Sequence, residues 1–254
     1  MLINAKDLYY RELNRQVRAA LKDGEGEVRL QNVNGQRYIA AGLRGQANVI
    51  VEGLPGNDLA AFMDGPTVTV YGNAQDGVGN TMNDGLVAVH GDAGDVIGYA
   101  MRGGRIYIRG DVGYRVGIHM KAFKDRVPTI IVGGCAKDFF GEYMAGGNLI
   151  LLGLPSVSSR PGTNGRSVVG HYCGTGLHGG AIYLRGPVDA SCLAQEHVAG
   201  KRLTAEDEAL LQRELTPFCE MLDLNLTDVL EGAPFQKLAP VSHRPFAANY
   251  APNV

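Results

Sequence analysis

Glycine recurs along this chain at nearly constant intervals, and this spacing constrains the fold more than any other sequence feature. The repeat glycines are Gly53, Gly72, Gly91, Gly110, Gly134, Gly153 and Gly186. Most steps are 19 residues long, and the two longer steps equal one period plus insertions of five and fourteen residues. A fixed period of about this length indicates a solenoid, in which each repeat packs only against its neighbours.

The residues before each repeat glycine follow the pattern of a β-strand with one buried face. Two and four positions before the glycine, every repeat carries an aliphatic residue. These pairs are Val49 and Val51, Val68 and Val70, Val87 and Val89, Ile106 and Ile108, Ile130 and Val132, Leu149 and Leu151, and Ile182 and Leu184. Alternation with period two predicts one strand per repeat, with these side chains pointing inward.

A second apolar column predicts that each repeat has another inward-facing segment. Ten residues after the repeat glycine stand Met63, Met82, Met101, Met120 and Met144, and Leu177 occupies the equivalent place in the coil with the fourteen-residue insertion. We expect this segment to be a second strand. One repeat cannot bury its apolar side alone, but repeats stacked ~4.8 Å apart form continuous ladders. The chain is therefore predicted to be mainly β, a single-stranded right-handed parallel β-helix of about seven coils.

The two ends of the chain are predicted to be helical caps. Residues 1–36 are expected to form an N-terminal helical cap, with a helix from Asp7 to Leu21, and a first strand. Residues 37–186 form the β-helix. Residues 187–254 are expected to form a helical segment and an extended arm from Gly232 onward. Thr204 and Asp207 resemble a capping box that opens a helix through about Leu215, which Pro217 interrupts.

The charge and the cysteine spacing argue against several classes of partner and of site. The formal net charge is −2 and no cluster of Lys and Arg occurs, so neither nucleic acid nor membrane is expected as a partner. No long apolar run or signal-like segment is visible, which predicts a cytoplasmic protein. The four cysteines are far apart and form no C-x-x-C pair, which favours free thiols over a disulfide framework or an iron–sulfur site.

Three local motifs have a structural interpretation that we favour over a binding site. The spacing of Gly174, Gly176 and Gly179 matches a dinucleotide fingerprint, but a strand rather than a helix follows, so a coil corner is expected. The potential metal ligands His171, Cys173 and His178 fit no common zinc spacing. A column of Asn57, Asp76, Asp95 and Asp138 could bind calcium, but Asx turns at the corners are favoured.

The coil sequences resemble a known family. The segments GNAQDGVGNTMNDG, GDAGDVIGYAMRGG and GCAKDFFGEYMAGG are similar to the glycine-repeat (GXGXG) domain at the C-terminal end of the large subunit of glutamate synthase. NVNGQRYIAAGL, EGLPGNDLAAFMDGP and VVGHYCGTGLHGG resemble the stand-alone form of that domain. The same repeat occurs in one of the subunits of formylmethanofuran dehydrogenase, in the related formyltransferase/hydrolase complex and in a subunit of N-methylglutamate synthase.

The resemblance implies a non-catalytic scaffold subunit of a complex that converts glutamine and 2-oxoglutarate to glutamate. Its partners would be a glutamine amidotransferase and an FMN/iron–sulfur synthase protein, with FMN and the cluster bound by the partners and no cofactor in this chain. The residues agree, because the family's amidotransferase needs an N-terminal cysteine nucleophile and residue 2 here is Leu. A role in one of the related complexes, and a homo-oligomer, are left open.

The candidate partner surface lies on the outward face of the predicted sheet. It comprises Tyr71, His90, Tyr107, Arg109, Tyr183 and Arg185. Tyr and Arg are enriched at interface hot spots, and the apolar Ile50, Ile131 and Ile150 extend the same face. We expect either the C-terminal helices or the synthase partner to cover this face. The alternative is an autonomous β-helix enzyme that uses the insertion Leu154 to Ser167 with His171 and His178, although no pair of facing acids is visible.

Overall fold

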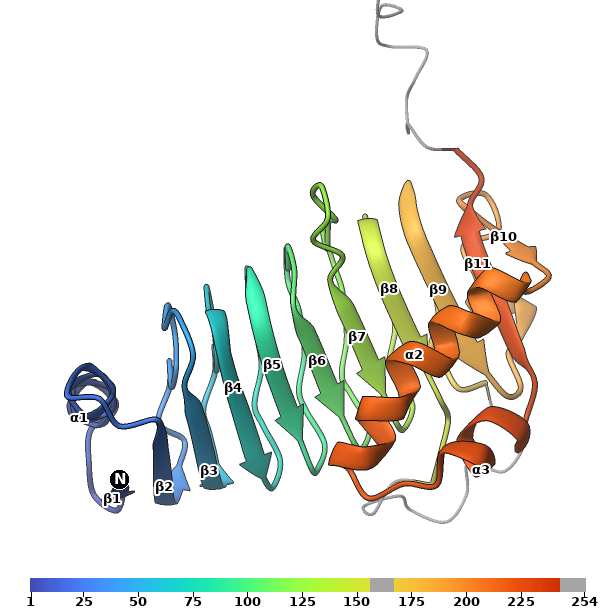
Figure 1. Cartoon of the computed structure of the whole chain (residues 1–254). Helices are drawn as coiled ribbons and strands as arrows, with labels where there is room; N and C mark the ends of the chain where they lie inside the picture. Colours follow the sequence, from blue (N-terminus) through green and yellow to red (C-terminus); the bar gives the residue numbers. More distant parts are fainter. Residues whose placement is uncertain (156–166, 243–254) are drawn as a thin grey trace, which may run out of the picture.

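The computed structural model describes residues 1–155 and 167–242, so most of the insertion between Leu154 and Ser167 lies outside the described residues. One sheet of eleven strands runs through the described residues, in the order β1-β2-β3-β4-β5-β6-β7-β8-β9-β11-β10 (Figure 1). The strands are β1 (Leu2–Asn4), β2 (Glu27–Asn34), β3 (Asn48–Leu54), β4 (Asp64–Tyr71), β5 (Asp84–Val89), β6 (Arg105–Ile108), β7 (Thr129–Val132), β8 (Ala145–Leu151), β9 (Gly179–Arg185), β10 (Val198–Lys201) and β11 (Phe235–Pro240). The helices are α1 (Tyr10–Lys22), α2 (Ala205–Met221), α3 (Leu226–Glu231) and the 3-10 turn η1 (Ala190–Cys192).

The predicted strands stack in parallel with the register that the sequence repeat requires. Val49 pairs with Val68, Val68 with Val87, and Val87 with Ile106. All fourteen aliphatic residues of the inward pairs are fully buried. The prediction of a mainly β, parallel-sheet solenoid is therefore confirmed. β2 joins this stack by pairing Val28 with Val49, so parallel stacking already begins within residues 1–36.

The second inward segment is not a strand, which corrects our expectation. The methionine column is fully buried as predicted, but along the backbone leading to it residues with positive φ alternate with residues that lack it. In one coil, Val96, Gly98 and Ala100 all have φ between 51° and 67°. Turn-type bonds such as the one from Met101 N to Gly98 O close the coil locally, while Gly98 N donates to Val78 O of the preceding coil. The apolar pattern of the sequence predicts which side chains point inward, but it does not determine the backbone φ angles between them.

The corner glycines make room for carboxylates of the preceding coil. Asp92 Oδ1 accepts a hydrogen bond from Asp111 N at 2.8 Å, and Asp76 Oδ1 accepts one from Asp95 N at 2.9 Å. A Cβ on Gly110 would lie 1.9 Å from Asp92 Oδ1, so close approach rather than positive φ requires this glycine. The Asx turns expected for Asp76, Asp95 and Asp138 are therefore wrong, because these carboxylates accept bonds from the backbone of the next coil.

The helices are placed differently from the predicted caps. α1 begins at Tyr10 rather than Asp7 and lies at the β1 end of the solenoid, where it buries Leu13 and Val17. α2 lies across the outer face of the sheet instead of over its end (Figure 1). The expected break near Pro217 is wrong, because α2 continues to Met221. A proline inside a helix costs about 3 kcal/mol, and burial of the surrounding α2 residues against the sheet offsets this cost.

The extended arm begins as a strand of this chain's own sheet. β11 runs antiparallel to β9, pairing Leu238 with Ile182, and β10 pairs antiparallel with β11. β11 therefore provides backbone partners for the last parallel strand. Residues 243–254 of the predicted arm lie outside the described residues.

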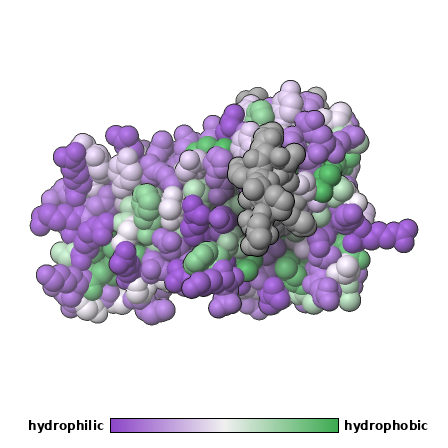
Figure 2. Space-filling view, turned by 90° about the horizontal axis from the view of Figure 1, so that it is seen from above, coloured by the Kyte–Doolittle hydropathy of each residue, from purple (hydrophilic) through white to green (hydrophobic). Residues whose placement is uncertain are grey.

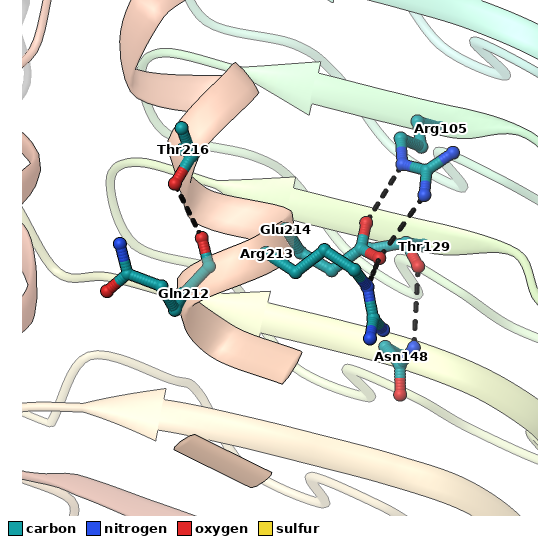
Figure 3. A network of polar contacts seen from close by, with 7 residues as sticks. All are labelled: Arg105, Thr129, Asn148, Gln212, Arg213, Glu214 and Thr216. Carbon is teal, nitrogen blue, oxygen red and sulfur yellow. Dashed lines mark hydrogen bonds and ion pairs between the residues drawn. The ribbon is translucent and has the colours of Figure 1, made fainter. Parts of the chain in front are cut away.

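Polar anchors fix α2 to the sheet. The carboxylate of Glu214, only 3% exposed, accepts hydrogen bonds from Arg105 Nε at 2.8 Å and Arg105 Nη2 at 3.2 Å (Figure 3). Arg213 Nε adds a third bond at 3.2 Å. Beside them, the Phe218 ring packs edge-on against Tyr107 with centroids 5.5 Å apart. A bidentate ion pair and an aromatic contact therefore set the position of α2 along the strands.

The start of α2 is held by a buried carboxylate. The predicted capping box is present, because Thr204 N donates to Asp207 Oδ2 and Asp207 N donates to Thr204 Oγ1. Asp207 Oδ1 also accepts bonds from Tyr183 Oη at 2.7 Å and Lys237 Nζ at 2.6 Å. Burial by itself would raise the pKa of Asp207, but Lys237 and the hydrogen-bond donors outweigh burial and hold the pKa well below its usual range.

This depressed pKa predicts an acid-sensitive contribution to stability. The pKa of Asp207 is lower in the folded state than in the unfolded state. Ionised Asp207 therefore stabilises the fold by roughly 2 to 4 kcal/mol above about pH 4, and this stabilisation is lost as the pH falls further. We expect Asp207→Asn to lower the melting temperature at neutral pH and to flatten its decline between about pH 5 and 2.5. Glu206→Gln, an exposed change on the same turn, is the control. An unchanged acid profile in Asp207→Asn would show that another group governs acid unfolding.

Candidate functional site: an aromatic ridge opposite the covered sheet face

Three of the six predicted partner-surface residues are buried under this chain's own C-terminal helices. Tyr107 is 1% exposed, Tyr183 is 2% exposed and Arg185 is 8% exposed. Arg185 donates to the carbonyl oxygens of Val229 and Leu152. Burial raises the pKa of Tyr107 to about 12 and lowers the pKa of Arg185. We expected either the C-terminal helices or a partner protein to cover this face. The C-terminal helices cover the part that contains Tyr107, Tyr183 and Arg185.

The other three predicted residues remain at least partly accessible, Tyr71 at the last position of β4 and His90 and Arg109 directly after β5 and β6. The rings of Tyr71 and His90 lie 4.6 Å apart, and Tyr71 is 52% exposed. Partial burial lowers the pKa of His90, so its neutral form is favoured. His90 and Arg109 line a shallow cleft of about 270 Å³. The structure thus separates the predicted surface into a buried half and an open half, and partner contact at the open half stays a prediction.

A larger exposed feature lies on the turn side of the coils. We define the aromatic ridge as Tyr99, His119, Phe139, Tyr143 and Tyr172. The His119 and Tyr143 rings stack at 5.5 Å with planes 10° apart, and Tyr99 meets His119 edge-on at 6.0 Å. Phe139 and Tyr172 stack at 4.9 Å. The ridge therefore crosses successive coils as two groups of rings in contact.

The backbone beneath the ridge favours glycine, yet it carries large side chains. His119, Phe139, Tyr143 and Tyr172 have φ between 51° and 63°. The left-handed conformation costs roughly 1 to 2 kcal/mol per residue with a Cβ. The last coil has glycine at a matching position, Gly176, over which the Tyr143 ring lies. The same conformation recurs outside the ridge, for example at Phe62, Thr81 and Ala100, so it belongs to the coil geometry, and the signal specific to the ridge is its stacked rings.

An ion pair supports the centre of the ridge. Arg115 Nη1 donates to Glu142 Oε2, and Glu142 is only 6% exposed. The Arg115 guanidinium lies 4.7 Å from the Phe139 ring centroid. The guanidinium restrains the Phe139 ring, and side chains restrained before binding lower the entropy cost of association. Rigid aromatic rings next to an arginine have the composition of an interface hot spot.

The ridge was missed by reasoning from the sequence alone, although a signal for it exists. His119 and Tyr143 directly precede Met120 and Met144, and Phe139 and Tyr172 directly precede Phe140 and Cys173. Neighbours of an inward column point outward, so aromatic residues there stack from coil to coil.

The other candidate sites have structural roles in the described residues. Cys173 is fully buried, and burial raises the pKa of its thiol. His178 Nδ1 lies 2.9 Å from Gly176 O. Within residues 1–155 and 167–242, no group of three His, Cys, Asp or Glu side chains is placed to hold a metal ion. Gly174 and Gly176 lie in a turn that leads into β9. In the same ranges, no helix has the length and apolar character needed to span a membrane.

These features define a glycine-repeat parallel β-solenoid with one face covered by its own helix and another carrying a rigid aromatic ridge. Residues 12–237 match the family described as GXGXG motif. The chain is also 46% identical to the uncharacterized protein MJ1350 of Methanocaldococcus jannaschii, in an alignment that covers all of this chain and 97% of the relative. The chain therefore belongs to the GXGXG motif family, as the sequence resemblance indicated.

Proposed function

We propose that this chain is a non-catalytic scaffold subunit of a glutamate-synthase-type complex, and that the aromatic ridge binds a partner protein. Membership of the GXGXG motif family supports the class of complex. The observation that carries the scaffold role is the ridge itself, where exposed rings stack from coil to coil and the Arg115–Glu142 ion pair lies beside the Phe139 ring. The partners would be a glutamine amidotransferase and an FMN/iron–sulfur synthase protein, which would bind FMN and the cluster.

The stacked architecture suits this role. A solenoid has neighbour-to-neighbour contacts only, so its length offers separate surfaces to separate partners. α2 covers the outer sheet face across β5 to β9, whereas the ridge lies on the turn side of the coils. We assign the ridge to the synthase protein and the cleft of His90 and Arg109 to a second contact.

Replacing two exposed ridge tyrosines tests the proposed contact. We expect Tyr143→Ala with Tyr172→Ala to weaken binding of the synthase protein, measured by interferometry and co-elution, by at least about 30-fold, equivalent to about 2 kcal/mol. The melting temperature should stay near the wild-type value, because both side chains are exposed.

The matched control is Phe62→Ala. Phe62 is also exposed and also has a positive φ, but it lies outside the ridge. We expect it to leave binding unchanged. Equal binding by the ridge variant and wild type would remove the ridge from the interface. Binding to formylmethanofuran dehydrogenase or N-methylglutamate synthase proteins, with none to glutamate synthase partners, would assign the chain to one of those complexes instead.

A further inference from the structure

The five-residue insertion in the repeat builds a loop that folds back over the preceding coils. The loop spans residues 121–127 and rises above β7 in Figure 1. Phe123 and Arg126 exchange two backbone hydrogen bonds, which closes a two-residue turn at Lys124 and Asp125. Arg126 reaches back to within 3.7 Å of Asp64, which belongs to an earlier coil. A regular coil has no such loop, so the insertion creates a feature that the fold itself does not need.

A hollow of about 740 Å³ lies between this loop and the side of the solenoid. It is lined by Asn83, Arg102, Lys121, Phe123, Lys124, Asp125 and Arg126. Asn83, Arg102 and Lys121 occupy equivalent positions in three successive coils, each directly after a buried methionine. Coil stacking therefore places the bases of these side chains ~4.8 Å apart in a row. Figure 2 views the molecule from above and shows a surface on which hydrophilic residues predominate.

The hollow concentrates positive charge on a protein whose net charge is negative. Four cationic residues and one carboxylate line it. Arg126 faces Asp64, and Lys124 Nζ lies 5.4 Å from the Phe123 ring centroid. The side chains of Arg102 and Lys121 have neither an ion pair nor a hydrogen bond within the described residues. Like charges in adjacent stacked positions are destabilising, and a bound anion would relieve this repulsion.

We propose that this hollow binds a small polyvalent anion that carries phosphate or carboxylate groups. Arg102 can hold one anionic group through its planar guanidinium, and Lys121 adds a point charge one coil away. The exposed Phe123 ring offers a flat apolar surface for the body of the ligand. The volume falls in the range of small-molecule sites. The site is independent of the proposed partner contact at the aromatic ridge.

Titration of the full chain with three probes tests the proposal. Pyrophosphate supplies charge alone, citrate supplies carboxylates, and ADP adds a planar group that can pack on Phe123. At low ionic strength we expect at least one probe to bind saturably, with a dissociation constant below about 1 mM by calorimetry and a matching rise in melting temperature. ADP should bind more tightly than pyrophosphate if the ring contributes.

The decisive variant is Arg102→Gln with Lys121→Gln. It should weaken binding at least about ten-fold, and it should melt higher than wild type in the absence of anions because repulsion is removed. Lys137→Gln with Lys201→Gln removes the same charge from exposed positions elsewhere and should leave binding intact. Failure of all three probes to bind saturably overturns the proposal. So does equal binding by the two double variants, which would show a nonspecific charge effect.

Discussion

Met101→Asp is expected to prevent folding of the solenoid. Met101 is fully buried in the methionine column, with Met82 and Met120 in the coils on either side. An unpaired carboxylate there would cost several kcal/mol, a large part of the roughly 5 to 15 kcal/mol that stabilises a typical domain. Soluble yield and circular dichroism melting measure the effect.

The control for this change is an apolar residue of similar volume. Met101→Leu should cost less than about 1.5 kcal/mol and remain soluble. Val89→Asp, in the strand column of the same core, should behave like Met101→Asp because Val89 is also fully buried. A wild-type melting curve for either aspartate variant would mean that the inward columns are assigned incorrectly.

Gly110→Ala is expected to destabilise the protein mainly through a clash with Asp92 of the preceding coil. The new Cβ would lie 1.9 Å from Asp92 Oδ1, and Gly110 lacks the positive φ that would add backbone strain. Either the coils separate or the carboxylate leaves Asp111 N, at a cost of roughly 2 to 4 kcal/mol. Urea unfolding measures the change.

A double-mutant cycle separates this clash from any other effect of the alanine. Asp92→Ala removes the obstructing carboxylate and costs about 1 to 3 kcal/mol by leaving Asp111 N without this acceptor. In the Asp92→Ala background, Gly110→Ala should cost much less, which gives a coupling energy of at least about 1 kcal/mol. Additive costs would contradict the role assigned to the corner glycine.

The strand side of the solenoid could be predicted because its residues obey simple rules. The aliphatic pairs alternate with period two, and a constant period places equivalent residues in adjacent coils. Val68 and Val87 therefore pair as expected. The turn side has the same repeat, but positive-φ residues recur along the backbone between its inward residues. The recurring glycines Gly79, Gly98 and Gly117 indicated this backbone in the sequence, because they have φ between 66° and 72°.

The candidate site was less predictable, because it depends on contacts between distant parts of the chain. The sequence indicated that the outer sheet face needs a cover, but whether α2 or a partner provides it depends on long-range pairs such as Tyr107 with Phe218. Arg105 and Glu214 are similarly separated by 109 residues. The aromatic ridge follows from stacking between coils, which only the register makes visible.

The central claim, that this chain organises partner enzymes without performing chemistry, is tested most directly by reconstituting activity. The amidotransferase and the FMN/iron–sulfur protein should be assayed for glutamate formation from glutamine and 2-oxoglutarate, with and without this chain. We predict that the chain alone has no glutaminase activity and binds no FMN, and that its addition raises glutamine-dependent glutamate formation while leaving the ammonia-dependent reaction unchanged. A stoichiometric flavin or glutaminase activity in the purified chain, or no effect of the chain on glutamine-dependent synthesis, would contradict the account.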